Sequence, residues 1–406
     1  MKIEPKTLKG FRDFLPLDLK KRNYVIDTLK KVFVSYGFEP LETPSLEYEE
    51  ILTGKYGDEG DKLMYKFEDN GKRKVAMRYD QTVPLSRVIA QYQNEITLPF
   101  KRYQIQNVWR AENTQKGRYR EFLQVDADIV GTYSPLADAE IIAIVFYALK
   151  ELNFKKFKIL LNDRMLFSTL PKLGITSNDV PLFVRAIDKL KKIGKEKVLE
   201  ELISGGIEPD RATYILQSIE SEKPTTRITE IFSVLETMGV NKDSLEFLPT
   251  LARGLDYYTG VIFEVEVDGY IVGSIAGGGR YDNLIGKFAG REIPAVGFAF
   301  GFDRLIEAME ELDLFPKDLN GKDVFVAFTE SGLQEKALEI TTRLRAKDLN
   351  VEYYLEDATL EKQLKYADKK QVPYVVIVEK DNLILKDMKK RSQENLPLEE
   401  IIKKLA

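Results

Sequence analysis

The stretch from Phe100 to Gly131 constrains the fold of this chain more than any other segment. It predicts two strands joined by a charged loop, and strand alternation sends successive side chains to opposite faces. The apolar face of the second strand comprises Leu123, Val125, Ala127 and Ile129, and its polar face comprises Gln124, Asp126 and Asp128. The polar face of the first strand comprises Arg102, Gln104, Gln106 and Arg110. The pattern predicts a hairpin that presents arginines and carboxylates to a ligand carrying groups of both signs, and a solvated sheet face is the common alternative.

Cysteine and histidine are both absent from the 406 residues. Their absence excludes disulfides, thiolate catalysis, Cys-based zinc sites and the usual general base near neutral pH. Any catalysis must therefore depend on carboxylates, arginines, tyrosines and a metal ion taken up from solution, such as magnesium. The net charge of -4 argues against a globally basic surface, so any contact with nucleic acid is expected in local patches.

The length predicts two or three domains, because it exceeds what one hydrophobic core usually organises. A hydrophobic content of 44% with 31% charged residues fits a folded, soluble protein. The sequence contains no apolar run of about eighteen residues and no apolar core of the signal-peptide type at its start. We therefore expect no membrane span and a cytoplasmic location.

The first part of the chain predicts strands with helices packed on them. A helix is expected from Asp18 to Tyr36, where Gly37 ends it, and another from Ser134 to about Leu152. Between them FEPLETPSLEY predicts a strand interrupted by proline, and Met64 to Tyr79 predicts a hairpin around the turn Asp69-Asn70-Gly71.

The remaining chain changes character twice. Helical periodicity broken by glycine and proline predicts a helical insertion, after which VIFEVEV and AVGFAFG resume the sheet and a helix begins near Phe302. Beyond a linker at LFPKDLNGKD, strands and helices alternate as in a parallel α/β layer. The predicted fold class is α+β, an antiparallel sheet flanked by helices, with a helical insertion and a C-terminal α/β domain. The predicted parts are 1–161 and 240–318 for the main domain, 162–239 for the insertion, and 319–406 for the C-terminal domain.

Two segments of the first part carry candidate binding residues. VAMRYDQTVPLSR places Arg78, Asp80 and Thr82 on the same face of an expected strand, before Pro84 begins a helix. A carboxylate and a hydroxyl so spaced could hold an ammonium group, and a strand end with a threonine cap is the alternative. The loop ENTQKGRYRE groups Gln115, Lys116 and Arg118 around Gly117, which suits phosphates as well as it suits an ordinary hairpin tip.

Two later segments combine arginine with tyrosine. LARGLDYYTG contains Arg253, Tyr257 and Tyr258, and an arginine there could stabilise charge on a reacting phosphate, whereas the tyrosines could be half-buried packing. AGGGRYDNL has three glycines before Arg280 and Tyr281, which permit close approach of a ligand or form a plain turn.

The segment GFAFGFDRL places Arg304 near a helix N-terminus, where the helix dipole also favours phosphate. The alternative is a surface ion pair with Asp303, which would be worth little.

Taken together, these segments resemble the class II aminoacyl-tRNA synthetases and, within them, the histidyl-tRNA synthetase family. GFEPLETPSLE is similar to the first motif of the class, VWRAENTQKGRYREF to the second and AVGFAFGFDRL to the third. LARGLDYYTG and AGGGRYDNL are similar to two segments that mark the histidine branch. The resemblance covers the whole chain in order, including the helical insertion and an anticodon-binding domain.

The resemblance implies activation of L-histidine with ATP, followed by transfer to the 3′ end of tRNA(His). By analogy Arg110 and Arg253 hold the α-phosphate, Arg304 holds the outer phosphates, and Glu112 and Phe122 hold the adenosine. The residues implied for histidine are Asp80, Thr82 and Gln124 at its amino and carboxylate ends, and Asp128, Tyr257, Tyr258 and Tyr281 around its imidazole. The acceptor end of the tRNA is assigned to Gln115, Lys116 and Arg118.

The resemblance also implies Mg²⁺ bound to ATP, no resident metal, and a homodimer built on the first motif. Some members carry Glu at the positions of Asp80 and Asp128. One alternative is a non-catalytic paralogue, such as the regulatory subunit of ATP phosphoribosyltransferase. That paralogue tends to lose the phosphate-binding arginines and the C-terminal domain, which are present here. A synthetase for glycine, threonine or proline is a third alternative, against which RGLDYY and GGGRYD count.

Overall fold

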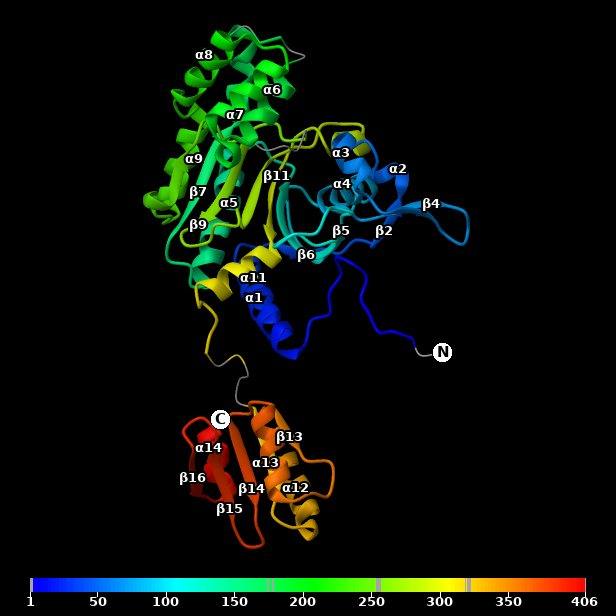
Figure 1. The fold of residues 1–406 in the computed structure, drawn as a ribbon, viewed down its shortest axis with the longest axis vertical. Helices are drawn as coiled ribbons and strands as arrows, with labels where there is room; N and C mark the ends of the chain where they lie inside the picture. Colours follow the sequence, from blue (N-terminus) through cyan, green and yellow to red (C-terminus); the bar gives the residue numbers. More distant parts are fainter. Residues whose placement is uncertain are drawn as a thin grey trace. The chain divides into compact units, whose positions relative to one another are not determined.

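The computed structural model describes residues 3–173, 175–176, 179–252, 257–317, 319 and 323–405. The chain forms two compact units, Met1–Phe315 and Pro316–Ala406 (Figure 1). The predicted α+β class is confirmed, because the larger unit is built on an antiparallel sheet with helices and the smaller one is an α/β domain. None of the described helices is long and apolar enough to cross a membrane.

The described part of the larger unit is organised around an eight-stranded sheet, in which the six central strands run antiparallel and each edge strand runs parallel to its neighbour. Its strands in spatial order are β1 (Glu39–Pro40), β5 (Phe100–Trp109), β6 (Glu121–Val130), β11 (Ala295–Gly301), β10 (Ala276–Arg280), β9 (Val261–Val267), β7 (Phe157–Asp163) and β8 (Leu245–Phe247). The strands expected at Phe100 to Gly131, VIFEVEV and AVGFAFG are all confirmed.

One face of this sheet is covered by helices that supply the main hydrophobic core. These helices are α1 (Pro16–Ser35), α5 (Pro135–Glu151), α9 (Thr226–Thr237) and α11 (Phe302–Glu311). The side chains of Val125, Ala127 and Ile129 point into this core, as strand alternation predicted. The two helices expected at Asp18–Tyr36 and Ser134–Leu152 are confirmed, and Ser134 caps the second by accepting a hydrogen bond from the Leu136 backbone N–H.

The opposite face is bordered by a smaller three-stranded sheet and short helices. The sheet has the order β2 (Leu46–Tyr48), β4 (Lys74–Met77) and β3 (Lys66–Glu68), and the helices are α2 (Glu49–Leu52), α3 (Gly57–Lys62), α4 (Thr82–Gln91) and α10 (Gly286–Ala289). The hairpin predicted around Asp69-Asn70-Gly71 is confirmed as β3 and β4. The single strand expected from FEPLETPSLEY is instead two short strands, β1 and β2, which belong to different sheets. Helix α4 begins at Thr82, two residues before the expected start at Pro84.

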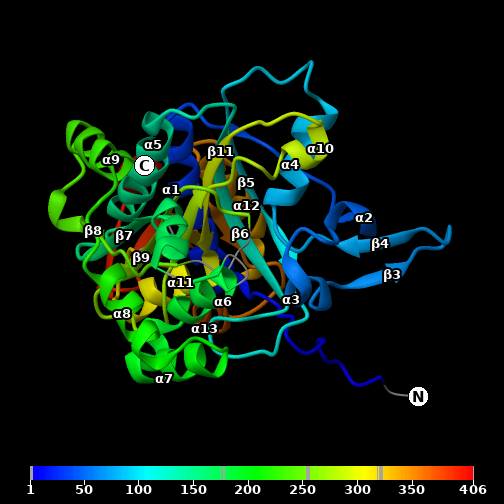
Figure 2. The same ribbon diagram turned by 90° about the horizontal axis from the view of Figure 1, so that it is seen from above.

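The helical segment after β7 has a core of its own. A 3₁₀ segment (Arg164–Leu173) leads into α6 (Val180–Asp188), α7 (Leu190–Ser204) and α8 (Pro209–Glu220), whose apolar side chains form a separate cluster. In Figure 2, α7 and α8 lie at one side of the larger unit and the β3–β4 hairpin extends from the opposite side. Helix α9 differs from these three, because Ile228, Ile231 and Leu235 pack into the main core.

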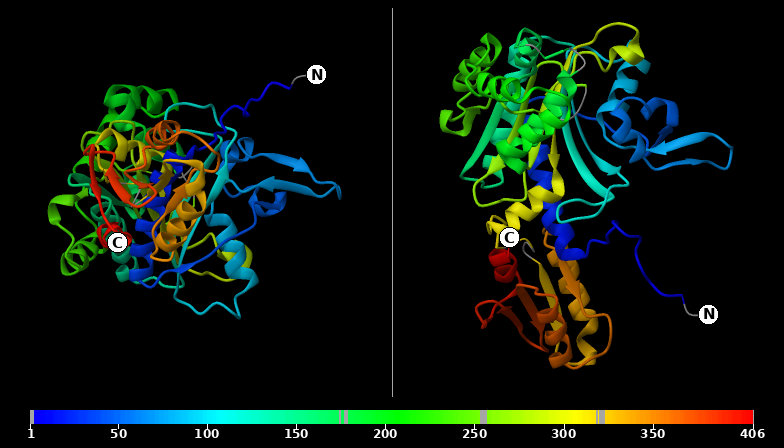
Figure 3. Two further views of the ribbon diagram at one scale, coloured as in Figure 1. Left: turned by 90° about the horizontal axis from the view of Figure 1, so that it is seen from below. Right: turned by 45° about the horizontal axis from the view of Figure 1, so that its top comes forward.

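The smaller unit is a five-stranded sheet with helices on both faces, as far as its residues are described (Figure 3). Its strands in order are β13 (Val351–Tyr353), β12 (Val324–Phe328), β14 (Tyr374–Val378), β15 (Leu383–Asp387) and β16 (Ser392–Asn395). Helices α12 (Gln334–Arg345) and α14 (Leu398–Leu405) cover one face and α13 (Leu360–Lys369) covers the other. The parallel direction of β12, β13 and β14 was predicted, whereas their spatial order and the antiparallel β15 and β16 were not.

The three glycines of AGGGRYDNL lie in strand β10 and not in the turn that was one expectation. A Cβ atom on Gly278 would come within 2.2 Å of the Gly297 carbonyl oxygen and within 2.7 Å of the Phe298 Cα. Both obstacles are backbone atoms of β11, so the strands could approach as they do only with glycine at this position.

Replacing Gly278 with alanine is therefore expected to lower the unfolding free energy of the larger unit by about 1–3 kcal/mol, the usual cost of overpacking. Chemical denaturation of the full chain measures the loss. Gly332→Ala is the matched control, because no atom lies within 4 Å of a Cβ at that position. Equal stability of the two variants would contradict the close approach of β10 and β11.

Candidate active site

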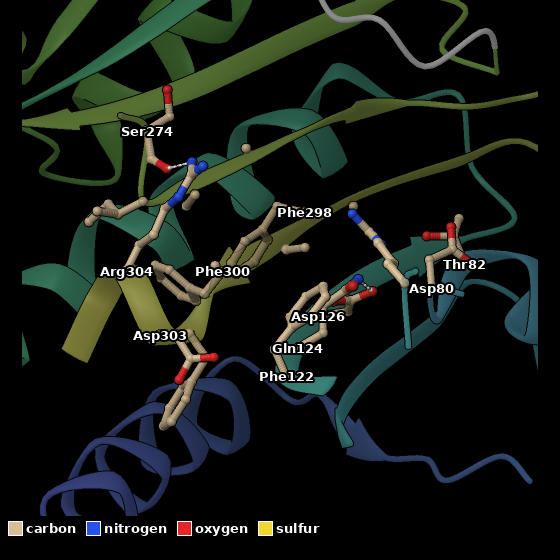
Figure 4. Close-up of a pocket in the computed structure, with 18 of the residues that line it drawn as sticks. Asp80, Thr82, Phe122, Gln124, Asp126, Ser274, Phe298, Phe300, Asp303 and Arg304 are labelled. Carbon is tan, nitrogen blue, oxygen red and sulfur yellow. Dashed lines mark hydrogen bonds between the residues drawn. The ribbon is translucent and has the colours of Figure 1, made fainter. Parts of the chain in front are cut away.

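A cavity of about 400 Å³ opens over the polar face of the central sheet. Its lining comes from α4, β6, β9, β10, β11 and the start of α11, together with the loop between β5 and β6 (Figure 4). Arg304 and Ser274 lie toward one end of this cavity, and Asp80 and Thr82 lie toward the other. Segments that are far apart in the sequence thus supply groups of opposite charge to one space.

The floor of the cavity is the polar face of β6, as predicted from the alternation of that strand. Gln124, Asp126 and Asp128 all line the cavity, and each is at most 6% exposed. The Gln124 side-chain amide donates to both carboxylate oxygens of Asp126 at 2.9 Å. Burial raises the pKa of Asp126 to about 8, with Arg102 opposing the rise and Asp128 adding to it.

The arginine of the neighbouring strand has a different task from the one its pattern indicated. Arg102 lies directly opposite Asp128 in the β5–β6 register, is fully buried, and pairs with the Asp128 carboxylate at 2.7 Å. Its guanidinium is therefore occupied by the protein. Burial raises the pKa of Asp128, and the positive charge of Arg102 opposes that rise.

Three tyrosine rings lie close together in the lining of the cavity, and one of them contacts Asp128. The Tyr281 hydroxyl donates to Asp128 Oδ1, and the Tyr257 ring lies 6.0 Å from that of Tyr281 and 4.9 Å from that of Tyr258. A Cβ on Gly297 would come within 1.8 Å of Asp128 Oδ1, so glycine leaves the space that this carboxylate occupies. The structure thus brings Asp128 and the three tyrosines into the lining of one cavity.

Asp80 and Thr82 lie where the chain enters α4. The Tyr56 hydroxyl donates to Asp80 Oδ1 at 2.6 Å, and the Val83 backbone N–H donates to the same oxygen at 3.1 Å. Asp80 is 5% exposed and its pKa is raised by burial. Arg78, which shares its parity, donates instead to backbone oxygens of Thr43, Pro44 and Asn107 and is structural.

Two arginines line the cavity at different places, Arg110 beside Tyr79 and Phe122 and Arg304 beside Ser274. The Arg110 guanidinium lies 4.6 Å from the Tyr79 ring and 5.2 Å from the Phe122 ring, and its Nε donates to the Tyr79 carbonyl. Arg304 donates to the Ser274 carbonyl at 3.0 Å. The alternative that Arg304 pairs with Asp303 is wrong, because Asp303 pairs with Arg12 and Arg22.

The loop between β5 and β6 folds back over the cavity. Glu112, Gly117 and Arg118 line the cavity, and Arg118 lies 3.4 Å from the Glu112 carboxylate. Gln115 and Lys116 are exposed outside the lining, with Lys116 paired to Glu311 at 2.7 Å.

The sequence also indicated two further arginines, Arg253 and Arg280. Arg253 lies outside the described residues. Arg280 does not face the cavity, because it is buried and bound to Asp138 at 2.6 Å, so it serves packing.

Some cavity residues were not selected from the sequence. Tyr56 comes from α2–α3, and Glu264 and Ser274 come from β9 and the turn before β10. Of these three residues, only Glu264 could have been found from the sequence, because it alternates with buried apolar residues along β9. Asp126 shared the polar face with its neighbours, and its burial beside Arg102 was the missing information.

Comparison with known proteins shows the family of this chain. The family model "Histidyl-tRNA synthetase" matches residues 10–305 and the model "Anticodon binding domain" matches residues 323–406. The chain is 39% identical over 451 residues to the histidine–tRNA ligase of Cytophaga hutchinsonii, covering 99% of each chain. It is 41% identical to that of Rhodopirellula baltica, covering 92% of this chain and 90% of the relative.

Among solved structures, the chain resembles the histidyl-tRNA synthetase from Nostoc sp. PCC 7120. The TM-score is 0.88 at 30% identity, with 100% of this chain and 99% of that chain covered. The antiparallel sheet and its charged cavity define the catalytic unit of a class II aminoacyl-tRNA synthetase. Within that class, the chain belongs to the histidyl-tRNA synthetase family and is an enzyme.

The raised pKa of Asp126 makes a testable difference to stability. Between about pH 4 and pH 8 the folded protein holds a proton that the unfolded chain has lost, so this contribution to stability is complete below about pH 4 and disappears as the pH rises through about 8. Asp126→Asn, which mimics the protonated form, is expected to raise Tm over wild type increasingly between pH 5 and pH 8. Thermal melts of the ligand-free chain measure this, with the exposed Asp268→Asn as control. A Tm difference that is constant with pH would contradict the assignment.

Proposed function

We propose that this chain activates L-histidine with ATP to histidyl-adenylate and pyrophosphate, and then transfers histidine to the 3′ end of tRNA(His). The observation that carries the proposal is a cavity that combines Arg110 and Arg304 with a buried Asp128. Arginines suit a triphosphate, and a buried carboxylate suits a cationic or neutral ring. Membership of the histidyl-tRNA synthetase family supports the same reaction.

In this proposal the histidine lies along the polar face of β6. Asp80, Thr82 and Gln124 bind its α-amino and carboxylate ends, and Asp128 with Tyr257, Tyr258 and Tyr281 reads its imidazole nitrogens. Amino acids that lack those nitrogens would leave hydrogen-bonding capacity of the buried Asp128 and Tyr281 unused, beyond the bonds that Asp128 makes with Arg102 and Tyr281. Such a site discriminates strongly without an editing step, because unpaired buried polar groups are costly.

ATP occupies the part of the cavity lined by arginine and aromatic side chains. Arg110 and Arg253 hold the α-phosphate, Arg304 holds the outer phosphates, and Glu112 and Phe122 hold the adenosine. The histidine carboxylate attacks the α-phosphorus directly and pyrophosphate leaves, so no protein nucleophile takes part. The rate enhancement comes from positioning and from fixed positive charge around the phosphorus, which is why arginines suffice.

Magnesium belongs to the proposal as a partner of the ATP phosphates. No group of three or more acidic side chains within the described ranges could hold a metal ion by itself. Near Arg304, however, Glu264 accepts a hydrogen bond from the Ser274 hydroxyl at 2.6 Å and lines the cavity. One carboxylate together with phosphate oxygens and water is a usual way to bind Mg²⁺, which would neutralise phosphate charge there.

In the same proposal, the acceptor end of the tRNA contacts Gln115, Lys116 and Arg118 in the loop between β5 and β6. The anticodon of the tRNA contacts residues 319–406. The division of the remaining chain into a catalytic domain of 1–161 and 240–318 with an insertion at 162–239 is part of the same proposal. A homodimer formed through α1 and β1 and a cytoplasmic location complete it.

A regulatory role without catalysis is the second candidate. A solved structure described as an ATP phosphoribosyltransferase regulatory subunit/histidyl-tRNA synthetase from Bacillus halodurans has a TM-score of 0.75 at 23% identity, which is a likeness of fold alone. Arg110 and Arg304 in the cavity and the second compact unit favour the synthetase.

Exchange of labelled pyrophosphate into ATP tests the reaction. With each amino acid supplied separately, exchange is expected with histidine and not with the others, because only histidine pairs with both Asp128 and Tyr281. Folded protein that shows no exchange with any amino acid would favour the regulatory role instead.

Replacing Arg253 with alanine is expected to lower the histidine activation rate about 100-fold or more while leaving histidine affinity nearly unchanged, because the side chain is assigned to charge that develops in the transition state. Stopped-flow measurement of adenylate formation and equilibrium dialysis with histidine separate the two quantities. Equal losses of rate and affinity would refute the assigned role.

A further inference from the structure

The segment before α1 is seated on the base of the loop that joins β5 to β6. The Gly10 carbonyl accepts hydrogen bonds from the backbone N–H groups of Arg120 at 2.9 Å and Glu121 at 3.4 Å. Gly10 has a φ of +88°, and a Cβ there would come within 2.7–2.9 Å of three carbon atoms of Arg120. Only glycine suits this contact, so the start of the chain is attached at a defined place.

Two residues later, Arg12 lies between this loop and helix α11. Its guanidinium carbon is 3.2 Å from the centre of the Tyr119 ring, and its Nη2 is 2.8 Å from Asp303 Oδ2. Stacking and ion pairing use different parts of a guanidinium, the flat face and the edge, so arginine can make both contacts at once. Lysine could not make both contacts in this way, because it lacks a planar guanidinium.

The carboxylate that Arg12 contacts is held firmly. Asp303 Oδ1 accepts a hydrogen bond at 2.8 Å from Arg22 of α1, and both side chains are only 8% exposed. Asp303 also lies in the first turn of α11, where a negative charge is favoured by the helix dipole. Figure 4 shows Asp303 directed toward α1, while the next residue, Arg304, extends toward Ser274.

The loop meets α11 at two further points. A Cβ on Gly117 would lie 3.3 Å from Arg304 Cγ, and Lys116 pairs with Glu311 at 2.7 Å. The Lys116 pair is largely exposed and contributes little. The contact through Arg12 is the one that is both shielded and anchored to a buried carboxylate.

We propose that Arg12 is a positioning residue for ATP: it couples the β5–β6 loop, through Tyr119, to the start of the helix that carries Arg304. The proposal rests on the proposed function, in which the loop and Arg304 enclose the triphosphate. Arg12 does not itself touch the reacting atoms. It holds the two walls of the ATP site at a fixed separation and leaves the histidine end, which is built on β6 and α4, unaffected.

The test compares Arg12→Gln with Lys9→Gln in the full-length enzyme. Both variants lose one positive charge from the same segment, but Lys9 is exposed. In histidine-dependent pyrophosphate exchange, Arg12→Gln is expected to raise KM for ATP about tenfold and to leave KM for histidine within about twofold of wild type. Lys9→Gln is expected to match wild type.

A second pair of variants tests the stacking partner. Tyr119→Phe keeps the ring and is expected to match wild type, whereas Tyr119→Leu is expected to raise KM for ATP as Arg12→Gln does. Because the two residues act as one bridge, the Arg12→Gln/Tyr119→Leu double variant should be no worse than either single variant. Tyr119 is partly exposed, so this pair still tests the bridge if Arg12→Gln folds poorly.

Three results would overturn the positioning role. These are an unchanged KM for ATP in Arg12→Gln, equal rises in KM for ATP and for histidine, or effects of the two single variants that multiply in the double variant. A wild-type enzyme without histidine-dependent exchange would instead overturn the proposed function, and that measurement is made first.

Discussion

The buried ion pair between Arg102 and Asp128 is the interaction on which the rest of the site depends. The two residues face each other across β5 and β6, and a slip of one residue in that register would turn their side chains to opposite faces of the sheet. Removing one member would leave an uncompensated charge in a dry environment, which typically costs about 3–5 kcal/mol. The pair therefore links strand register to site chemistry. It places a carboxylate at the floor of the cavity, sets its charge through a neighbouring guanidinium, and leaves its second oxygen to Tyr281.

In the proposed reaction, the side chains that line the cavity above this pair bind and orient the two substrates and take no chemical part in the reaction. Direct attack of one substrate on the other needs no protein nucleophile and no histidine base, so a chain without histidine or cysteine is sufficient. Close packing fixes the positions of the side chains that line the cavity. Gly297 makes room for Asp128, Gly278 lets β10 approach β11, and Gly10 attaches the start of the chain to the loop over the cavity. Positions without a side chain thus determine where the charged side chains lie.

Local pattern was sufficient to predict the elements that carry one buried face. The stripe of α1, the apolar strands β9 and β11, and the alternation of β6 are all recognisable within a few residues, since each is a direct consequence of helix or strand periodicity. The assignment of individual arginines was less successful. Arg78, Arg102 and Arg280 stand in segments that also contain cavity residues, yet each is bound to backbone oxygens or a buried carboxylate. Their partners come from the segment between β1 and β2 and from β5, β6 and α5, and nothing in the local sequence records which of these elements will lie opposite.

The sequence by itself determined the class of fold, the order of the segments and the polar face of β6, because these follow from side-chain periodicity and from motifs that are continuous in the chain. Only the tertiary structure decided which charged groups remain available in the cavity and which are consumed by packing. It also brought Arg12 between Tyr119 and Asp303, residues more than a hundred positions away from it. The reason is physical: the state of a charged side chain depends on its burial and on its nearest partner, and both are properties of long-range packing.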